Sequence, residues 1–353
     1  MKIAIVTDTH FGARNDNLNF NDYFYKFYDN IFFPTLKERE ITTCIHMGDV
    51  VDRRKYISYR IAHDFRSRFI ERFREMGIDL HIIIGNHDTY YKNTNEINSM
   101  DELVGRDRVW IYSEPQIVEF DDTPILFIPW INANNYDKSI KFLNTAKTDL
   151  LMGHLEISGF QMYRGQYSEN GYDRELFRRF DTIFSGHFHH KSDDGTIYYL
   201  GNPYEITWSD YKDPRGFHIF DTDKRSLEYI QNPYRMFRKF YYDDSDSTFE
   251  SLTEKDYSEY ENTYVKVVIQ KKTNPFWFDT VLDELYAADV ANLVVVENFS
   301  DLEFMEDDEI IDEAQDTLTI LSKYVESLNV ENKTELNTLM RNLYNEALTV
   351  ETI

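Results

Sequence analysis

The stretch that decides the fold is Gly-Asn-His-Asp at residues 85–88, which directly follows the apolar run Leu-His-Ile-Ile-Ile at residues 80–84. The apolar run predicts a buried strand, and the glycine at its end lets the backbone turn sharply. An amide oxygen, an imidazole and a carboxylate then stand together at one strand end. Such side chains bind metal ions or transfer protons, although Asn and Asp also occupy ordinary turns.

Four other segments repeat this arrangement of a short apolar strand followed by polar residues of the metal-ligand type. They are Asp-Thr-His at residues 8–10, Gly-Asp at 48–49, Gly-His at 153–154 and Gly-His-Phe-His-His at 186–190. Any one of these residues, taken alone, is more simply a turn or cap residue. Five such strand ends along one chain predict a metal centre.

Between these motifs the chain alternates strand-like and helix-like segments. Residues 20–38 and 57–76 carry aromatic and aliphatic side chains at helical spacing, which predicts two helices whose aromatic faces are core. This alternation predicts largely parallel strands with helical crossovers. The carboxyl ends of such strands, where the motifs stand, are where ligands collect.

The middle of the chain predicts further strands and one irregular segment. Residues 197–200, 217–220 and 227–230 are expected to be strands and suggest a second sheet packed on the first. Residues 158–172 are polar and contain glycine without a clear period. They are either a loop that shapes access to the site or a plain surface insertion.

Composition excludes several classes of protein. The chain has 353 residues and one cysteine, Cys44, so that it forms no disulfide within the chain and fits a reducing, cytoplasmic compartment. The N-terminus enters a strand at once, which does not resemble a signal peptide. No apolar run approaches the ~18 residues that a membrane span requires.

The net charge weighs against tight DNA binding by this chain alone. The formal charge is −25, and residues 231–353 hold 27 acidic and 10 basic residues. DNA binding normally rests on Lys and Arg that meet phosphate groups. An acidic protein can still bind DNA through metal ions, a local basic patch or a basic partner.

The five motifs, in their order along the chain, resemble the calcineurin-like metallophosphoesterase superfamily. Within it the chain resembles the SbcD-type nuclease subunits of DNA double-strand-break repair complexes, and its short form resembles the recombination endonuclease subunits of T-even-like bacteriophages. Gly-Asn-Pro at residues 201–203 is similar to the Gly-Ser-Pro of SbcD-type nucleases, with Asn in place of Ser. The resemblance covers residues 1–221 well and the rest by order of elements.

The resemblance implies an α/β (α+β overall) architecture in three parts. Residues 1–232 would form a metallophosphoesterase β-sandwich flanked by helices, and residues 233–300 a small α+β capping domain that positions DNA. Residues 301–353 would form an acidic linker and a C-terminal αα-hairpin, whose second helix begins near Asn332 and Glu335. The hairpin either packs on the capping domain or binds a partner, and the resemblance implies a coiled-coil ATPase of the SbcC type.

The resemblance also implies individual roles at the metal centre. One ion would be held by Asp8, His10, Asp49 and His189, and the other by Asp49, Asn86, His154 and His187. His87 would contact the scissile phosphate and protonate or stabilise the departing oxygen, and Asp88 would orient His87. Mixed N and O ligands suit Mn²⁺, Fe²⁺ or Zn²⁺ better than Mg²⁺, and the family implies Mn²⁺, with Mg²⁺ weaker.

The predicted activity is that of a two-metal DNA nuclease. Hydrolysis of a phosphodiester needs a nucleophile at neutral pH and neutralised phosphate charge, and two divalent ions about 4 Å apart supply both. The family implies 3′→5′ exonuclease and endonuclease activity on double-strand ends and single-strand structures, with access controlled by the ATPase. It also implies a cytoplasmic protein, in the host cell if phage-encoded, and a homodimer through helices of the nuclease domain, near residues 20–33 or 57–76.

Three basic residues, Arg53, Arg54 and Lys55, follow Asp49 closely and are either phosphate contacts or a solvated turn. Two other functions stay open. Gly-Asp-Val-Val-Asp-Arg at residues 48–53 is similar to a motif of serine/threonine phosphatases, which indicates a metallophosphatase or a small nucleotide phosphodiesterase. Those phosphatases carry Gly-Asn-His-Glu where this chain has Gly-Asn-His-Asp. The other alternative is a non-catalytic DNA-end-binding scaffold, although no ligand position is missing.

Overall fold

The computed structural model describes residues 1–297, 325, 332–333, 336 and 339–340. They fall into two units: Met1–Ile206 with Asp210–Val295, and Thr207–Ser209 with the described residues from Val296 onward. The features discussed below belong to the first unit. The linker and hairpin predicted at residues 301–353 lie outside the described residues, apart from a few isolated positions, and stay predictions.

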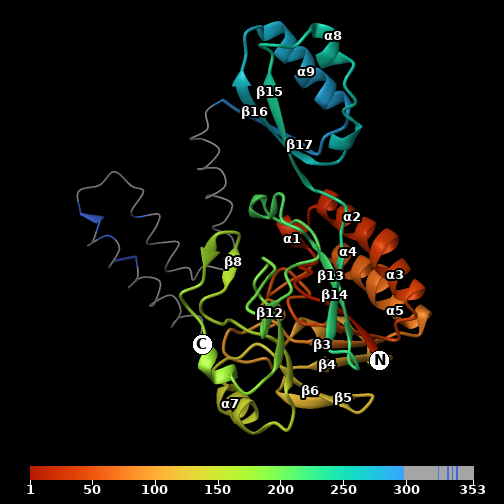
Figure 1. The fold of residues 1–353 in the computed structure, drawn as a ribbon, viewed down its shortest axis with the longest axis vertical. Helices are drawn as coiled ribbons and strands as arrows, with labels where there is room; N and C mark the ends of the chain where they lie inside the picture. The colour runs from red at the N-terminus through yellow and green to blue at the C-terminus, as the bar shows by residue number, and fades with distance from the viewer. Residues whose placement is uncertain (298–324, 326–331, 334–335, 337–338, 341–353) are drawn as a thin grey trace. The chain divides into compact units, whose positions relative to one another are not determined.

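The first sheet has six strands in the order β14-β13-β1-β2-β3-β4 (Figure 1). Its parallel strands are β1 (Lys2–Val6), β2 (Thr43–His46), β3 (Asp79–Ile83) and β4 (Val109–Tyr112). Two antiparallel strands, β13 (Gly216–Asp221) and β14 (Ser226–Gln231), continue the sheet beyond β1. The parallel pairing expected from strand–helix alternation is confirmed for the first four strands.

The second sheet has the order β11-β12-β10-β7-β6-β5. Its strands are β5 (Gln116–Phe120), β6 (Thr123–Ile128), β7 (Leu150–His154), β10 (Thr182–Gly186), β11 (Ser192–Asp193) and β12 (Ile197–Tyr199). The expectation that residues 217–220 and 227–230 belong to this sheet is wrong. They form β13 and β14, which cover the edge of β1 and satisfy its backbone groups.

The two sheets pack face to face around a shared apolar core. Alternate residues of the first sheet, such as Ile5 and Ile45, meet Phe127 and Met152 of the second, and all four are fully buried. Burial on this scale is the main stabilising contribution to such a sandwich. It also fixes the carboxyl ends of the strands in both sheets relative to one another.

Two long helical segments cover the outer face of the first sheet (Figure 1). One consists of α1 (Ala13–Asp16), α2 (Leu18–Phe27), η1 (Tyr28–Phe32) and α3 (Phe33–Glu38), and the other of α4 (Tyr59–Asp64), η2 (Phe65–Ile70) and α5 (Glu71–Met76). The expected helices are confirmed, but each contains a π-helical turn, η1 and η2. Aromatic side chains fill the contact, as between Tyr28 and Phe69, whose ring centroids are 4.9 Å apart.

The outer face of the second sheet is covered by α7 (Tyr136–Thr145) and the 3₁₀ helix η3 (Arg174–Phe177). The short helix α6 (Ser99–Leu103) follows the loop that begins with Gly-Asn-His-Asp. The irregular segment 158–172 contains a two-stranded hairpin, β8 (Gln161–Tyr163) and β9 (Gln166–Tyr167). Among the described residues, no helix is both long and apolar enough to cross a membrane.

The region after residue 232 builds a small α+β body with a core of its own. It consists of β15 (Phe237–Asp243), α8 (Phe249–Thr253), η5 (Ser258–Tyr260), β16 (Tyr264–Lys271), α9 (Pro275–Ala287) and β17 (Asn292–Val296). Its sheet has the order β15-β16-β17, and Phe240, Val267 and Val281 lie in its core cluster. This matches the expected α+β character, whereas the domain boundaries at residues 232 and 300 stay predictions.

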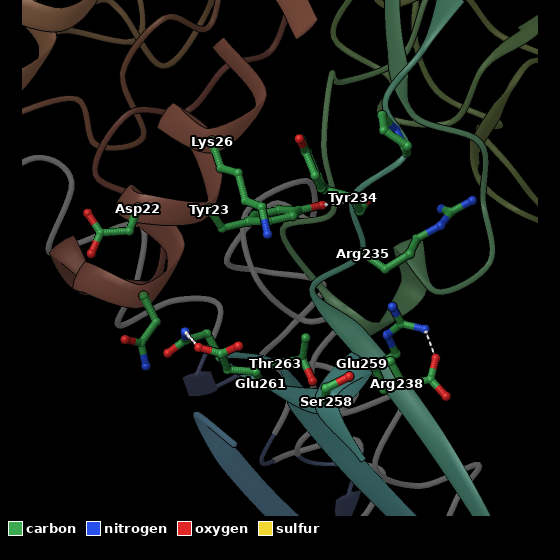
Figure 2. Close-up of a pocket in the computed structure, with 13 residues that line it drawn as sticks. Asp22, Tyr23, Lys26, Tyr234, Arg235, Arg238, Ser258, Glu259, Glu261 and Thr263 are labelled. Carbon is green, nitrogen blue, oxygen red and sulfur yellow. Dashed lines mark hydrogen bonds and ion pairs between the residues drawn. The ribbon is translucent and has the colours of Figure 1, made fainter. Parts of the chain in front are cut away.

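A cavity of about 420 Å³ lies where α2 meets the start of this body. In Figure 2, Tyr23 and Lys26 of α2 face Tyr234 and Arg235, and Arg238 pairs with Glu259 on the far side. The Lys26 ammonium lies 4.7 Å from the centre of the Tyr234 ring. None of the predicted site residues lines this cavity.

Candidate metal centre

The motif residues meet because parallel strands in each sheet end at the same edge. Asp8, Asp49 and Asn86 follow β1, β2 and β3, which are neighbours in the first sheet. His154 ends β7, and His187 follows β10, its neighbour in the second sheet. The packing of the two sheets brings the two groups together.

Two glycines let the loops after β2 and β3 touch. A Cβ at Gly85 would lie 2.3 Å from the Asp49 backbone nitrogen, and a Cβ at Gly48 would lie 2.8 Å from the Gly85 backbone. Gly48 also has φ of +99°, a conformation that L-residues rarely adopt. Any larger residue at position 85 would push Asp49 away from Asn86.

Four residues of the metal centre have strained backbone conformations. Asp8, His10, Asp49 and His187 all have positive φ, between 43° and 86°. Such conformations cost roughly 1–3 kcal/mol each and persist where surrounding structure holds them, typically at functional sites. Here the His187 backbone nitrogen donates to Asp8 Oδ1 at 3.0 Å, and the His10 nitrogen donates to the Asp49 carbonyl at 3.1 Å.

The first ligand cluster consists of Asp8, His10 and His189. The Nε2 atoms of His10 and His189 lie 3.0 Å apart. Asp8 is fully buried, and its Oδ2 accepts a hydrogen bond of 2.7 Å from the Thr7 hydroxyl. Three ligand atoms from β1 and β10 loops thus face one point.

The second ligand cluster consists of Asp49, His154 and His187, joined by the Asn86 amide oxygen. Asn86 Oδ1 lies 2.9 Å from His154 Nε2 and 3.0 Å from His187 Nδ1. His154 Nδ1 donates to the Met47 carbonyl at 2.9 Å. That bond keeps the proton on Nδ1, so that Nε2 is the nitrogen that can bind a metal ion once the ring is neutral.

Asp49 lies between the two clusters. Its Oδ2 is 3.2 Å from His154 Nε2 and 4.0 Å from His10 Nε2. Its Oδ1 accepts a hydrogen bond of 2.8 Å from the His87 backbone nitrogen. One oxygen is therefore held by the protein, and the other faces both clusters.

The electrostatics of the centre reflect buried acids beside buried imidazoles. Burial opposes the charged form of His10, but its contact with Asp52 and the charges of Asp49 and Asp8 outweigh this and raise its pKa to about 10. Burial likewise opposes protonation of His154, yet Asp49 raises its pKa to about 9. Burial lowers the pKa of His187 to about 3 and raises that of Asp8 to about 6.

The donor set fits two divalent ions. Imidazole nitrogens and carboxylate or amide oxygens converge in two buried groups, and the Nε2 atoms of His10 and His189 face each other. Such N/O sets suit Mn²⁺, Fe²⁺ or Zn²⁺. All seven predicted ligand positions contribute to one of the two groups.

His87 lies at the edge of the clusters with its ring partly accessible. Its Nδ1 lies 2.6 Å from the Asp52 carbonyl oxygen, to which it donates, and this leaves Nε2 as the outward atom. The His87 ring stands edge-on to that of His10, with centroids 4.9 Å apart. The ring of His87 therefore lies beside the first cluster, and its role as a proton donor stays a prediction.

Asp88 is buried beneath the loops that carry Asp49 and His87. Its carboxylate accepts hydrogen bonds from three backbone nitrogens, those of Val50, Val51 and Gly85. Since the Asp52 carbonyl engages the ring of His87, Asp88 acts on the two loops that carry Asp49 and His87. The role of Asp88 in orienting His87 stays a prediction.

The three predicted phosphate contacts lie in the loop after Asp49. Arg53 pairs with Asp16 and lies over the Tyr56 ring. Arg54 Nη1 donates to the Thr89 hydroxyl at 3.1 Å, two residues beyond His87. The role of Arg53, Arg54 and Lys55 as DNA contacts stays a prediction.

Sequence reasoning missed Arg215, which is buried and holds the loop of His187 and His189. It donates to the His189 carbonyl, to Asn202 Oδ1, and to Asp210 and Asp213 at 2.6 and 2.9 Å. Asp213 also contacts His190 Nδ1 at 2.7 Å. The charged cluster Asp-Pro-Arg at residues 213–215, next to a strand, was the available signal.

His46, which lies in β2, has a structural role. His46 is buried against the Thr9 hydroxyl at 2.9 Å, and burial lowers its pKa to about 3.

The β8–β9 hairpin lies beside the centre: the His190 nitrogen donates to the Met162 carbonyl, and the centroid of the Tyr163 ring is 6.4 Å from that of His189. This favours the interpretation of segment 158–172 as a loop next to the site.

Comparison with known proteins agrees with this geometry. Residues 1–191 match the family model described as calcineurin-like phosphoesterase. Exonuclease subunit 1 of Enterobacteria phage T4 is 31% identical over 294 residues, which cover 83% of each chain. A subunit of the SbcCD nuclease of Staphylococcus saprophyticus, the SbcD component, is 26% identical over 205 residues, which cover 45% of this chain and 53% of that protein.

Solved structures give weaker likenesses. An archaeal phosphodiesterase matches at 16% identity with a TM-score of 0.32, covering 66% of this chain and 100% of that one. A dimetal phosphatase from Danio rerio matches at 9% identity with a TM-score of 0.39, covering 67% of this chain and 97% of that one. At these scores the matches add nothing to the geometry above.

A β-sandwich with two histidine–carboxylate clusters at its strand ends defines the class of metallophosphoesterases. The family match and the phage relative place the chain within that class. The chain belongs to the calcineurin-like phosphoesterase family, as a nuclease subunit of the SbcD type. The resemblance drawn from the five motifs is confirmed.

Proposed function

We propose that this nuclease subunit hydrolyses DNA at double-strand ends and in single-strand structures with two divalent ions, Mn²⁺ above all. Its activities would be those of a 3′→5′ exonuclease and of an endonuclease. The observation that carries the proposal is the pair of ligand clusters joined by Asp49, with His87 beside them. Both clusters are built on strand ends that the core holds rigidly.

Two divalent ions, when bound, would neutralise the phosphate and supply a nucleophile at neutral pH. Asp8, His10, Asp49 and His189 would hold one, and Asp49, Asn86, His154 and His187 the other. Asp49 would keep the two sites together because its Oδ2 faces both clusters. The Met47 carbonyl and Thr7 hydroxyl orient His154 and Asp8, so that little rearrangement is needed.

His87 would act on the phosphate rather than on the metal. Nδ1 donates to the Asp52 carbonyl, and Nε2 would donate a proton or hydrogen bond to the phosphate. The departing oxygen of a cleaved phosphodiester needs such a proton. Asp88 supports this by fixing the backbone of the loops on which His87 and Asp49 stand.

DNA would be guided by local charge, since the whole chain is acidic. Arg53, Arg54 and Lys55 form a basic loop beside His87, and the capping body would hold DNA over the site. Two of these cations lie near tyrosine rings, with Arg53 over Tyr56 and Lys55 near Tyr90. An ATPase of the SbcC type, bound through residues 301–353, would supply the affinity that this chain lacks.

The proposed homodimer would use the surface around Tyr56, Tyr59, Tyr90, Tyr91 and Ile97. All five are exposed, and Tyr59 at the start of α4 is 96% accessible. Tyr56, Tyr90 and Ile97 line one shallow pocket, and exposed aromatic side chains near one another favour an interaction site. The aromatic residues of helix 20–33 are largely buried within the chain, so that the start of helix 57–76 is the better of the two predicted dimer elements.

Light scattering on the purified protein tests the dimer. Tyr59→Glu places a charge in the interface and should give monomers, whereas Ile117→Glu, at an exposed position on β5, should leave the mass unchanged. A wild-type protein that stays monomeric, alone and with its ATPase, would refute this part of the proposal. The nuclease assignment does not depend on it.

The activity is tested by cleavage of end-labelled duplex DNA with Mn²⁺, with and without the presumed ATPase. Release of nucleotides from 3′ ends supports the proposal. Protein that leaves DNA intact in every condition but hydrolyses phosphopeptides or small phosphodiesters would be a metallophosphatase or nucleotide phosphodiesterase instead. Protein that binds DNA ends and never hydrolyses a phosphoester would be a scaffold.

A further inference from the structure

Trp130 stands beside the second ligand cluster without belonging to it. It follows β6, and its backbone nitrogen donates to the Ile84 carbonyl at 2.8 Å, one residue before the Gly-Asn-His-Asp loop. Its indole ring lies 5.2 Å from the ring of His187 and 6.2 Å from that of His154. The backbone of the first sheet therefore fixes an aromatic side chain at the edge of the metal centre.

The Trp130 backbone is held to an unusual degree. Its carbonyl accepts hydrogen bonds from the side-chain amides of Asn95 at 2.9 Å and Asn135 at 3.0 Å, with Asn132 at 3.5 Å. All three asparagines are buried, and Asn132 also donates to Asn95 at 2.8 Å. They come from two separate loops, so that both loops converge on this one carbonyl.

The side chain of Trp130 is, by contrast, only partly covered. It is neither buried nor fully exposed, and within the described part of the chain no acceptor receives a hydrogen bond from its indole N–H. A buried indole usually finds such a partner. A rigid backbone that carries a partly exposed aromatic side chain suits contact with a ligand.

Nucleobases are the part of the proposed substrate that such a ring would meet. Stacking on aromatic side chains is how proteins hold single-stranded nucleic acid without reading its sequence, since every base has a π-face. The metal clusters bind the phosphate, and the base attached to that nucleotide lies within a few ångströms of it. Among the described residues, Trp130 is the tryptophan whose ring contacts ligand histidines, namely His154 and His187.

We propose that the Trp130 indole stacks on the base of the nucleotide whose phosphate lies at the metal centre. The proposal rests on the nuclease function above and deepens it: it makes the enzyme select substrates that carry a base at the scissile phosphate and tolerate all four bases. The three asparagines that donate to the Trp130 carbonyl hold its backbone in place for this contact. Trp130 would be a substrate-binding residue with no part in holding metal.

Calorimetry on the full-length, Mn²⁺-loaded protein tests this, with deoxyadenosine 5′-monophosphate and deoxyribose 5-phosphate as probes. The quantity compared is the ratio of the two affinities. A stack is worth ~1–3 kcal/mol per base, so that Trp130→Ala should lower this ratio by roughly 5- to 150-fold. Trp130→Phe keeps a ring and should retain most of the preference.

A matched control and a metal titration separate stacking from a structural role. Trp110 is an exposed tryptophan on β4 that stacks on His81, and Trp110→Ala should leave the affinity ratio unchanged. Mn²⁺ titration of Trp130→Ala should still give two sites. Loss of a metal site, or an equal loss of affinity for both probes, would show that Trp130 only supports His187 and would overturn the stacking proposal.

The same experiment distinguishes failure of this inference from failure of the nuclease assignment. Wild type is assayed in parallel on DNA and on bis(p-nitrophenyl) phosphate, which carries no base. A wild type that hydrolyses both but shows no preference for the base-bearing probe overturns the role of Trp130 alone. A wild type that hydrolyses neither, with two ions bound, overturns the proposed function.

Discussion

The Nε2 atoms of His10 and His189 lie 3.0 Å apart although 179 residues separate them in the chain. Two neutral imidazoles cannot share this contact with both lone pairs facing inward, so that one nitrogen must carry a proton. The pKa of His10, raised to about 10, makes His10 the donor. Burial, followed by the charge of His10, lowers the pKa of His189 well below its usual range and makes it the acceptor.

Metal binding is therefore expected to release protons at neutral pH. His10 and His154, with pKa values of about 10 and about 9, are protonated at pH 7 in the metal-free protein, and a ligand imidazole must be neutral. Affinity should rise as pH increases toward about 9–10 and fall as pH decreases. Mn²⁺ titrations at pH 7 in buffers of different ionisation enthalpy measure the protons released.

A surface variant provides the control for proton release. His63 is exposed on α4, and His63→Asn should release as many protons as wild type. Calorimetric heats that do not depend on the buffer would contradict the protonation states assigned to His10 and His154.

Asp49→Asn should separate the two metal sites. The amide keeps the size of the side chain and can still accept from the His87 nitrogen, but it removes the charge that faces both clusters. We expect one tightly bound ion in place of two and loss of DNA hydrolysis to background. Metal analysis after dialysis checks this, with Asp137→Asn on α7 as an exposed control, and retention of two ions would refute the bridging role.

His87→Gln should affect the rate and leave the metals in place. The side chain of His87 donates to the Asp52 carbonyl and is not one of the predicted ligands, and its backbone nitrogen can still donate to Asp49 in the variant. Removing a general acid typically costs about 10²–10⁴-fold in rate. Single-turnover cleavage together with metal analysis measures both effects, and a variant that cleaves normally with two ions bound would exclude His87 from catalysis.

The sequence predicted the residues of the centre because parallel strands end at one edge, and motif residues at strand ends must then meet. It could not give the partner of β13, since periodicity reports which face of a strand is buried but not which strand lies beside it. The contact between His87 and the Asp52 carbonyl could not be predicted either, because every residue has a backbone carbonyl and the sequence does not show which one accepts. The charged cluster at residues 213–215 gave only a weak signal for Arg215, because its four acceptors come together only in the fold.

Gly85→Ala should destabilise the protein and disturb the second metal site. The added Cβ would lie 2.3 Å from the Asp49 nitrogen, which is backbone and cannot move aside cheaply. Overpacking of this kind costs ~1–3 kcal/mol or more. Gly105→Ala is the matched control, because its Cβ would meet only the far end of the Arg74 side chain at 3.0 Å. Equal unfolding free energies of the two variants in urea would contradict the close approach.

Arg215→Met should weaken both the fold and the first metal site. Arg215 is 2% exposed and pairs with Asp210 and Asp213, so that methionine fills the volume but leaves two buried carboxylates without their cation. Breaking a buried pair in this way costs ~3–5 kcal/mol. The His189 carbonyl loses its donor at the same time, so that the His189 ring is no longer held against His10.

Two readouts test the role of Arg215 separately. Urea denaturation gives the stability, and the visible absorption of bound Co²⁺ reports the geometry of the ligand clusters. Arg178→Met removes an exposed pair with Glu175 and should change stability by less than ~1 kcal/mol and the spectrum not at all. Arg215→Lys restores a cation but not the planar fork, so that it should regain part of the stability without the wild-type spectrum. A wild-type Co²⁺ spectrum in a folded Arg215→Met protein would show that the loop of His189 is positioned without Arg215.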